Sequence, residues 1–109
     1  MSDAMDTNTD DCPPVPDFPG ALVCEMRIVN KKGLHARATA KFVQCVDRFD
    51  VEIKVYRCGE TVNGTSIMGI LTLGAGMGST ITVAAIGPQA AEALEKLAAL
   101  VAARFGEDC

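Results

Sequence analysis

GLHARATA, residues 33–40, stands where the pattern of a β-strand gives way to the pattern of a helix. In residues 22–29, apolar and polar side chains alternate with the two-residue period of a half-buried strand. Apolar side chains then recur every three or four residues, which indicates an amphipathic helix over about 36–48. The one histidine of the chain, His35, therefore lies at a helix entrance, where unpaired backbone N–H groups and the positive end of the helix dipole attract anions. Arg37 can reach the same anion, and phosphate is the expected one.

Beyond this stretch the sequence predicts three more strands and two more helices. Period-two alternation marks the strands, and apolar residues at helical spacing between capping and stop signals mark the helices. The predicted elements are a hairpin over 51–62 with its turn at 57–60, a short helix over 67–73 capped by Thr65 or Ser66, a strand over 80–85, and a final helix that opens at Gly87-Pro88 and stops near Gly106.

The predicted element order is β-α-β-β-α-β-α. Four strands cannot bury both faces of a sheet alone, so the two long helices cover one face and leave the other to solvent. The sequence therefore predicts an α+β protein, an open-faced β-sandwich in which a four-stranded antiparallel sheet carries three helices.

Charge is distributed unevenly along the 109 residues. Residues 1–20 hold five of the fourteen acidic residues, no basic residue and four prolines, which predicts a disordered acidic leader ahead of one domain over 21–109. The ten basic residues and the other nine acidic ones lie in this domain, whose net charge is only +1. A nearly neutral domain with one tyrosine and no tryptophan offers neither the basic stripe nor the stacking surface of a nucleic-acid binder.

The five cysteines are scattered singly, so the sequence predicts neither a zinc site nor a disulfide framework. Cys24 and Cys45 fall on apolar faces, where a thiol acts as a small hydrophobic group, and no catalytic cysteine, metal or cofactor is predicted. No apolar run approaches the ~18 residues that span a bilayer, and the N-terminus lacks a basic region followed by an apolar one. We therefore expect a cytoplasmic monomer without membrane insertion.

His35 meets the requirements of a phosphoryl acceptor by itself. A neutral imidazole is a nucleophile near neutral pH and needs no activating base. The backbone N–H groups of residues 36–38 and the Arg37 guanidinium can hold the phosphoryl oxygens. Two alternatives stay open: an isolated histidine is ordinarily a cap or a surface residue, and a hydrolase would need an acid or base near His35, where the nearest acids in sequence are Glu25 and Asp47.

Two motifs carry a family resemblance: GLHARATA at 33–40 and TSIMGILTLGAGMGS at 65–79. At this spacing and within this element order, the chain closely resembles the histidine-containing phosphocarrier (HPr) family of the phosphoenolpyruvate-dependent phosphotransferase system, over roughly residues 22–106. The resemblance implies a β-α-β-β-α-β-α fold and a histidine that accepts phosphate on Nδ1 from enzyme I and passes it to an enzyme IIA. It implies a carrier that is modified and regenerated, and not an enzyme.

The resemblance also assigns roles to single residues. His35 matches the phosphorylated histidine, and Arg37 matches the arginine that contacts the phosphate. Ser66 matches a serine that a dedicated kinase phosphorylates and a phosphorylase restores in some members, although a serine before an apolar helical run is ordinarily a cap. The implied partner surface consists of apolar residues of the first and second helices, namely Ala36, Ala40, Ile67, Met68 and Leu71.

One position departs from the family pattern, because Ala38 stands where many members have proline. Alanine keeps a backbone N–H that proline lacks, so the hypothesis is a slight change in phosphate stability without loss of transfer. Alanine at this position is similar to carriers of proteobacterial type, including those of a nitrogen-related regulatory branch. An alternative function therefore stays open, a regulatory interaction module of that branch that signals through the phosphorylation state of His35 or Ser66.

Overall fold

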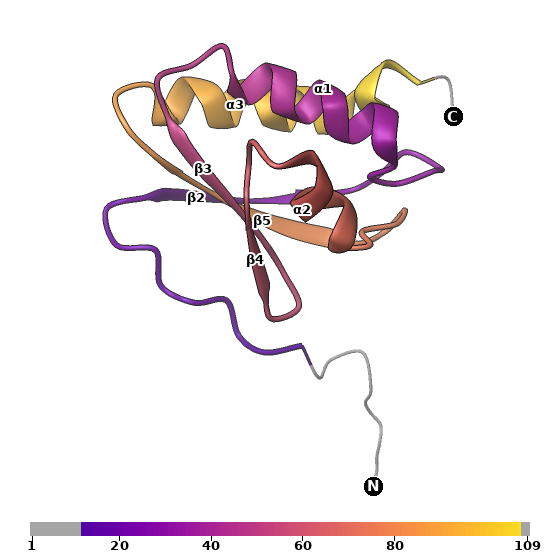
Figure 1. The fold of residues 1–109 in the computed structure, drawn as a ribbon, viewed down its shortest axis with the longest axis horizontal. Helices are drawn as coiled ribbons and strands as arrows, with labels where there is room; N and C mark the ends of the chain where they lie inside the picture. The colour runs from indigo at the N-terminus through magenta and orange to yellow at the C-terminus, as the bar shows by residue number, and fades with distance from the viewer. Residues whose placement is uncertain (1–11, 108–109) are drawn as a thin grey trace, which may run out of the picture.

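The computed structural model describes residues 12–107 and contains the predicted order of strands and helices (Figure 1). A short 3₁₀ turn follows the last helix, and the sequence had indicated only a stop signal there. The elements are β2 (Leu22–Arg27), α1 (Ala36–Val46), β3 (Glu52–Arg57), β4 (Glu60–Asn63), α2 (Ile67–Thr72), β5 (Thr80–Ile86), α3 (Ala90–Ala102) and the 3₁₀ turn η2 (Arg104–Gly106). The predicted α+β open-faced sandwich is confirmed.

The four strands form one antiparallel sheet in the order β2-β5-β3-β4. The last strand, β5, lies inside the sheet and pairs with both β2 and β3, with Met26 opposite Ile81 and Val55 opposite Val83. Strands β3 and β4 form the predicted hairpin, whose turn pairs Arg57 with Glu60. The two edges of the sheet are therefore β2 and β4.

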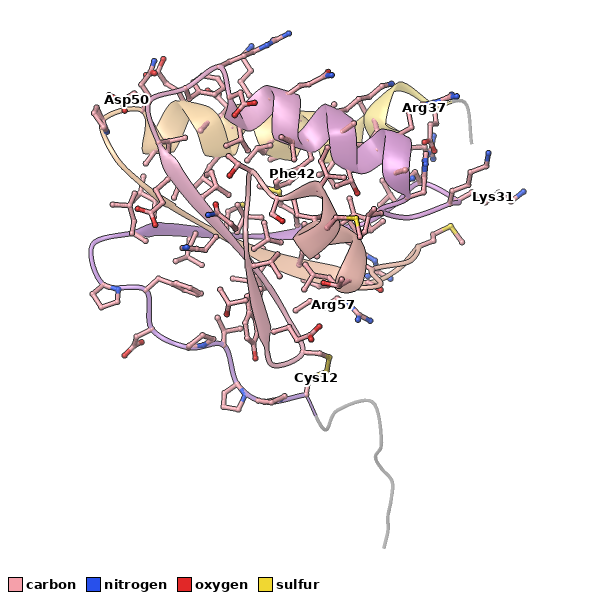
Figure 2. All side chains as sticks on the ribbon, in the orientation of Figure 1. Cys12, Lys31, Arg37, Phe42, Asp50 and Arg57 are labelled. Carbon is pink, nitrogen blue, oxygen red and sulfur yellow. A yellow bond between two sulfur atoms is a disulfide. The ribbon has the colours of Figure 1, made fainter. Side chains whose placement is uncertain are left out.

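The core lies between the sheet and the helices. Alternate residues of the inner strands, among them Val55 and Val83, are fully buried against the helices, and Figure 1 shows α1 and α3 side by side over this face. Phe42 of α1 fills the middle of the core, as Figure 2 shows, and Phe105 of η2 closes one end of it. Burial of one such side chain stabilises a fold by about 1.5–3 kcal/mol.

Three helix boundaries differ from the prediction. Helix α3 ends at Ala102 and not near Gly106, because Arg104 and Phe105 have positive φ and form a separate turn. Helix α1 ends at Val46, because the N–H groups of Arg48 and Phe49 bond to carbonyls three residues back and so close turns. Helix α3 begins at Ala90, after Pro88, because Gln89 is held in the loop: its side chain accepts a hydrogen bond from Asp50 N at 2.7 Å. These last two differences come from turns at the end of the sandwich opposite His35, the N-cap of α1.

A disulfide between Cys12 and Cys58 corrects the prediction that the cysteines form none. Singly scattered cysteines carry no pairing signal, and this pair forms because the chain before β2 reaches the β3–β4 turn. The carbonyls of Pro13 and Pro14 also accept from the Tyr56 hydroxyl, so residues 12–14 contact the domain, which their composition did not indicate. Residues 1–11 of the predicted leader lie outside the described residues, and the boundary at residue 20 stays a prediction.

Among the helices that the structure describes, none has the length and apolar character needed to cross a bilayer. Within residues 12–107, no group of three or more histidine, cysteine or acidic side chains is arranged to hold a metal ion.

Candidate functional site

The turn before His35 is fixed by a glycine. Gly33 has a φ of +67°, and a Cβ there would lie 2.5 Å from the carbonyl oxygen of Ala75. The neighbouring Leu34 donates its N–H to the same carbonyl at 2.9 Å. Only glycine permits this approach, because any larger residue would meet backbone atoms that cannot move aside. The turn is therefore held against the loop that follows α2, and this contact fixes the position of His35.

His35 is the N-cap residue of α1 by its backbone and not by its side chain. Its φ of −79° and ψ of 179° are extended, and its carbonyl accepts the N–H of Thr39 at 2.9 Å, the first hydrogen bond of the helix. The imidazole makes no capping hydrogen bond and is 28% exposed. The alternative in which the ring serves as a helix cap is therefore wrong, and the ring is available for other partners.

The partner of the ring is Glu107, which sequence reasoning missed. Nε2 of His35 is hydrogen-bonded to Oε2 of Glu107. The chain reverses direction at η2, where Arg104 and Phe105 both have positive φ, and this reversal places the Glu107 carboxylate beside the ring. The buried side chain of Phe105 anchors the turn in the core. Lys41 of α1 donates to the Phe105 carbonyl at 2.6 Å and ties η2 to α1. The two residues of the pair are 72 positions apart, and no short-range pattern points to such a contact.

Asn30 joins the carboxylate to the turn. Its side chain is buried, and Nδ2 donates to the Gly33 carbonyl at 2.8 Å and to Oε1 of Glu107 at 3.1 Å. The hydrogen bond from His35 lowers the pKa of Glu107, and the Asn30 amide and the charge of Lys32 add to this effect against the opposing effect of burial. The carboxylate is therefore ionised at neutral pH, and both of its oxygens are positioned.

An ionised carboxylate can only accept hydrogen bonds, so the ring nitrogen that contacts it must carry the proton. The contact therefore selects the tautomer of His35 with hydrogen on Nε2. In the neutral ring, the lone pair is then on Nδ1. The geometry thus anchors Nε2 and leaves the lone pair of the neutral ring on Nδ1.

The other predicted residues of the site lie on the first turn of α1 and on α2. Ala36 and Arg37 are exposed at the start of α1, next to the ring, while Ala38 is buried beneath them. Figure 2 shows Arg37 at this end of the helix. Ala40 is half-buried one turn further along. The guanidinium therefore belongs to the same end of α1 as His35.

Ser66 is the N-cap of α2, and its Oγ accepts the N–H of Gly69 at 3.0 Å. The capping role considered from the sequence is confirmed. Helix α2 packs against α1, and its outer side exposes two large apolar residues, Ile67 and Met68, the latter to 70%. Leu71 is half-buried beside them. Exposed apolar groups of this kind are often found where a protein contacts a partner.

Comparison with known proteins gives the same family throughout. The family description "PTS HPr component phosphorylation site" matches residues 23–103. A phosphocarrier protein HPr of Cupriavidus necator is 50% identical over 80 residues, which cover 73% of this chain and 90% of that protein. A phosphocarrier protein NPr of Shewanella violacea is 41% identical over 83 residues, 76% of this chain and 91% of that one.

The solved structures agree with these relatives. The crystal structure of an HPr from Thermoanaerobacter tengcongensis superposes with a TM-score of 0.77 at 39% identity, and the match covers 81% of this chain and 99% of that one. The proteins of this family carry a phosphoryl group between other proteins and are not themselves enzymes. The chain belongs to the HPr family of phosphocarrier proteins of the phosphotransferase system.

Proposed function

We propose that Nδ1 of His35 accepts a phosphoryl group from enzyme I and passes it to an enzyme IIA. The observation that carries this proposal is the contact between Nε2 and Glu107, because it leaves the lone pair on Nδ1 at the N-terminus of α1. Enzyme I and the IIA acceptor are the partners that the family resemblance implies. The predictions of a cytoplasmic location and a monomeric state accompany this proposal.

The transfer step needs no other base. The Nδ1 lone pair attacks phosphorus, an N–P bond forms on His35, and the bond from phosphorus to the donor breaks. Nε2 keeps its proton throughout. The ring gains positive charge as the bond forms, and the Glu107 carboxylate faces the nitrogen that shares this charge. Onward transfer reverses the same step toward the acceptor.

The entrance of α1 can hold the phosphoryl oxygens. Since α1 begins at Ala36, the N–H groups of its first three residues have no partner within the helix, and they lie at the positive end of its dipole. Arg37 supplies planar paired donors on the same turn. These interactions are moderate and solvent-exposed, which suits a carrier that must release its cargo.

The partner surface of this proposal is the apolar group Ala36, Ala40, Ile67, Met68 and Leu71. In this proposal, Ser66 is a regulatory residue that a serine kinase phosphorylates and a phosphorylase restores. A phosphate on Oγ would add about two negative charges beside this surface, next to Ile67, and would weaken docking. The cap geometry supports the position, because the first turn of a helix tolerates an anion.

The second candidate function is the regulatory module of a nitrogen-related branch, and the likeness to a relative named NPr favours it. In that case, the phosphorylation state of His35 or Ser66 would change the binding of a target protein. The two functions differ in onward transfer, since a relay hands its phosphate to an IIA acceptor of sugar transport and the module does not.

The test is to incubate the full chain with phosphoenolpyruvate and enzyme I, and then with individual IIA proteins. The relay predicts acid-labile labelling, one added phosphoryl group by mass spectrometry, a ³¹P signal typical of Nδ1 phosphorylation, and transfer to a sugar-branch IIA. Labelling without such transfer would favour the regulatory module. Equal labelling of His35→Ala would exclude the relay and any signalling through phosphorylated His35.

A further inference from the structure

The face of the sheet away from the helices is partly covered. Val55 faces the helix-side core, so the next residue of β3, Tyr56, points to the other face. Tyr56 is nevertheless only 5% exposed, and Thr82, on the same face of β5, is also 5% exposed. The chain before β2 lies over them, because Cys12, Pro13 and Val15 line one cavity together with Tyr56 and Thr82. We refer to residues 12–20 as the N-terminal strap.

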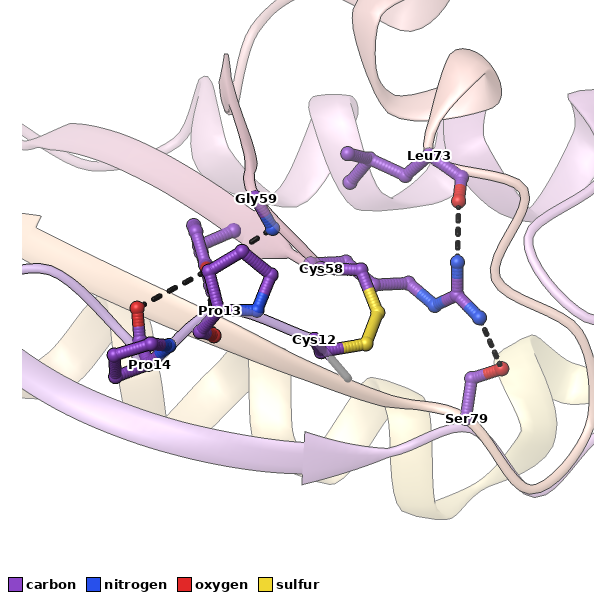
Figure 3. The surroundings of a disulfide bond; sticks show 9 residues. Cys12, Pro13, Pro14, Cys58, Gly59, Leu73 and Ser79 are labelled. Atoms are coloured by element: carbon purple, nitrogen blue, oxygen red, sulfur yellow. Dashed lines mark hydrogen bonds between the residues drawn. A yellow bond between two sulfur atoms is a disulfide. The ribbon is translucent and has the colours of Figure 1, made fainter. Parts of the chain in front are cut away.

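Two contacts hold the strap (Figure 3). The first is the disulfide from Cys12 to Cys58, at the tip of the β3–β4 hairpin. The second is the Tyr56 hydroxyl, which lies 3.0 Å from the Pro13 carbonyl and 3.2 Å from the Pro14 carbonyl, and accepts the N–H of Gly59 at 2.9 Å. A phenol has one proton to share between the two carbonyls. The non-covalent contact is therefore slight, and the covalent one carries the attachment.

The composition of the strap also indicates that the disulfide is its main attachment to the domain. Its four prolines have no N–H, so the strap cannot pair with the sheet as an extra strand. Its side chains are exposed apart from a half-buried Phe18, so little apolar area is buried beneath it. Without the disulfide, one hydrogen bond and this small area must offset the entropy of holding the segment in place.

We propose that the Cys12–Cys58 disulfide is a redox-controlled latch on the N-terminal strap. In the disulfide state, the strap covers Tyr56 and forms one wall of an open cavity of about 540 Å³. In the dithiol state, the strap leaves the sheet, which exposes Tyr56 and removes that wall. Cys12 and Cys58 are exposed, so a small thiol can reach the bond in the folded protein.

The reductant is a small thiol or dithiol. One thiolate attacks Cys12 or Cys58, the S–S bond breaks, and a mixed disulfide forms with the other cysteine released as a thiolate. A second thiolate attacks the small-molecule sulfur of this mixed disulfide and releases the remaining protein cysteine as a thiolate. Two electrons pass to the protein, two protons end on Cys12 and Cys58, and a small-molecule disulfide leaves. In a reducing cytoplasm such a bond is transient, as a latch requires.

The latch is separate from the phosphoryl site. Cys12 and Arg37 lie at opposite ends of the molecule in Figure 2, and the strap lies over the face of the sheet opposite α1. Its state can therefore be measured without enzyme I or phosphate.

The single tyrosine makes the test direct. The chain has one tyrosine and no tryptophan, so tyrosine fluorescence reports Tyr56 alone. Acrylamide is a neutral quencher, so the charges of the protein do not repel it. We expect the full chain, oxidised with glutathione disulfide, to resist quenching, and reduction with dithiothreitol to raise the quenching constant several-fold. Peptide mapping should find Cys12 joined to Cys58 in the oxidised sample only.

Two variants complete the test. Cys12→Ser should quench as strongly as the reduced chain under both conditions, and it changes only the strap. Cys24→Ala, which alters a thiol outside the disulfide, should keep the full redox response. Circular dichroism checks that each variant folds. The proposal is overturned if the oxidised chain lacks the Cys12–Cys58 pair, if oxidised and reduced chains quench equally, or if folded Cys12→Ser responds to redox state as the natural chain does.

Discussion

Nε2 of His35 is hydrogen-bonded to Oε2 of Glu107 at the entrance of α1. The last described residue of the chain therefore determines which ring nitrogen of its one histidine carries the proton. The carboxylate is itself oriented by Asn30, and the turn η2 delivers it. The acceptor site is thus built from the segment after β2 and the segment after α3. Changes at either segment should alter the chemistry of the ring.

Removing the carboxylate should slow phosphoryl acceptance. A hydrogen bond to a charged group is among the stronger ones in proteins, so Glu107→Ala should lower the rate of phosphoryl acceptance from enzyme I roughly tenfold. Glu107→Gln keeps an acceptor oxygen without the charge, so its rate of phosphoryl acceptance should lie between those of the natural chain and Glu107→Ala. Nitrogen chemical shifts should report hydrogen on Nε2 in the natural chain and mixed tautomers in Glu107→Ala. Unchanged tautomers with an unchanged rate would leave Glu107 without a role.

The same contact should make stability depend on pH. The pKa of Glu107 in the folded protein lies below its ordinary 4.5, so the ionised form favours folding at pH values above 4.5. This contribution is lost as the pH falls through the folded pKa. The natural chain should therefore be more stable to urea than Glu107→Gln at pH 7, and the two should converge once the pH has fallen below the folded-state pKa of Glu107. A constant difference between them would exclude this linkage.

Arg37 should matter for its geometry as well as its charge. Arg37→Ala should lower the rate of phosphoryl acceptance by about tenfold, since paired donors on an anion are among the stronger hydrogen bonds. Arg37→Lys keeps the charge without the planar fork and should recover only part of the rate. Folding should be unaffected because the side chain is exposed. If the lysine variant matched arginine fully, charge alone would explain the effect.

Gly33 should tolerate no side chain. Gly33→Ala places a Cβ 2.5 Å from the Ala75 carbonyl at a φ of +67°, and it should cost about 2 kcal/mol or more in the free energy of unfolding. Gly76→Ala is the matched control, because nothing lies within 4 Å of its Cβ and its φ is not positive. The free energy of unfolding of Gly76→Ala should stay within about 0.5 kcal/mol of that of the natural chain. Urea unfolding of both variants measures the contrast.

Ala38→Pro tests the departure from the family pattern. Ala38 is the third residue of α1, where a helix leaves the N–H without a partner, so proline should be accepted there. We expect the phosphohistidine half-life to change by less than about threefold and transfer to be retained, because the Ala38 N–H is one hydrogen-bond donor among several. A large change in half-life would show that the Ala38 N–H dominates phosphate binding.

The elements could be predicted from the sequence because their signals are local. Alternation in residues 22–29, the turn at 57–60 and the cap at Ser66 each depend on neighbours a few positions away. Glu107 and the Cys12–Cys58 bond could not be predicted, because they join segments 72 and 46 positions apart whose approach depends on the finished fold. The C-terminal end of α1 shifted for the same reason, since the turns after Val46 depend on packing at the end of the sandwich.

The placement of β5 has a consequence for how the protein is made. Strands β2 and β3 never touch each other, and each needs β5 as its neighbour. On a translating ribosome, therefore, a chain that has not yet reached Thr80 holds one lone strand and one hairpin, and neither is stable alone. The sheet can therefore assemble only after Thr80–Ile86 has emerged, and the contact between His35 and Glu107 forms later still.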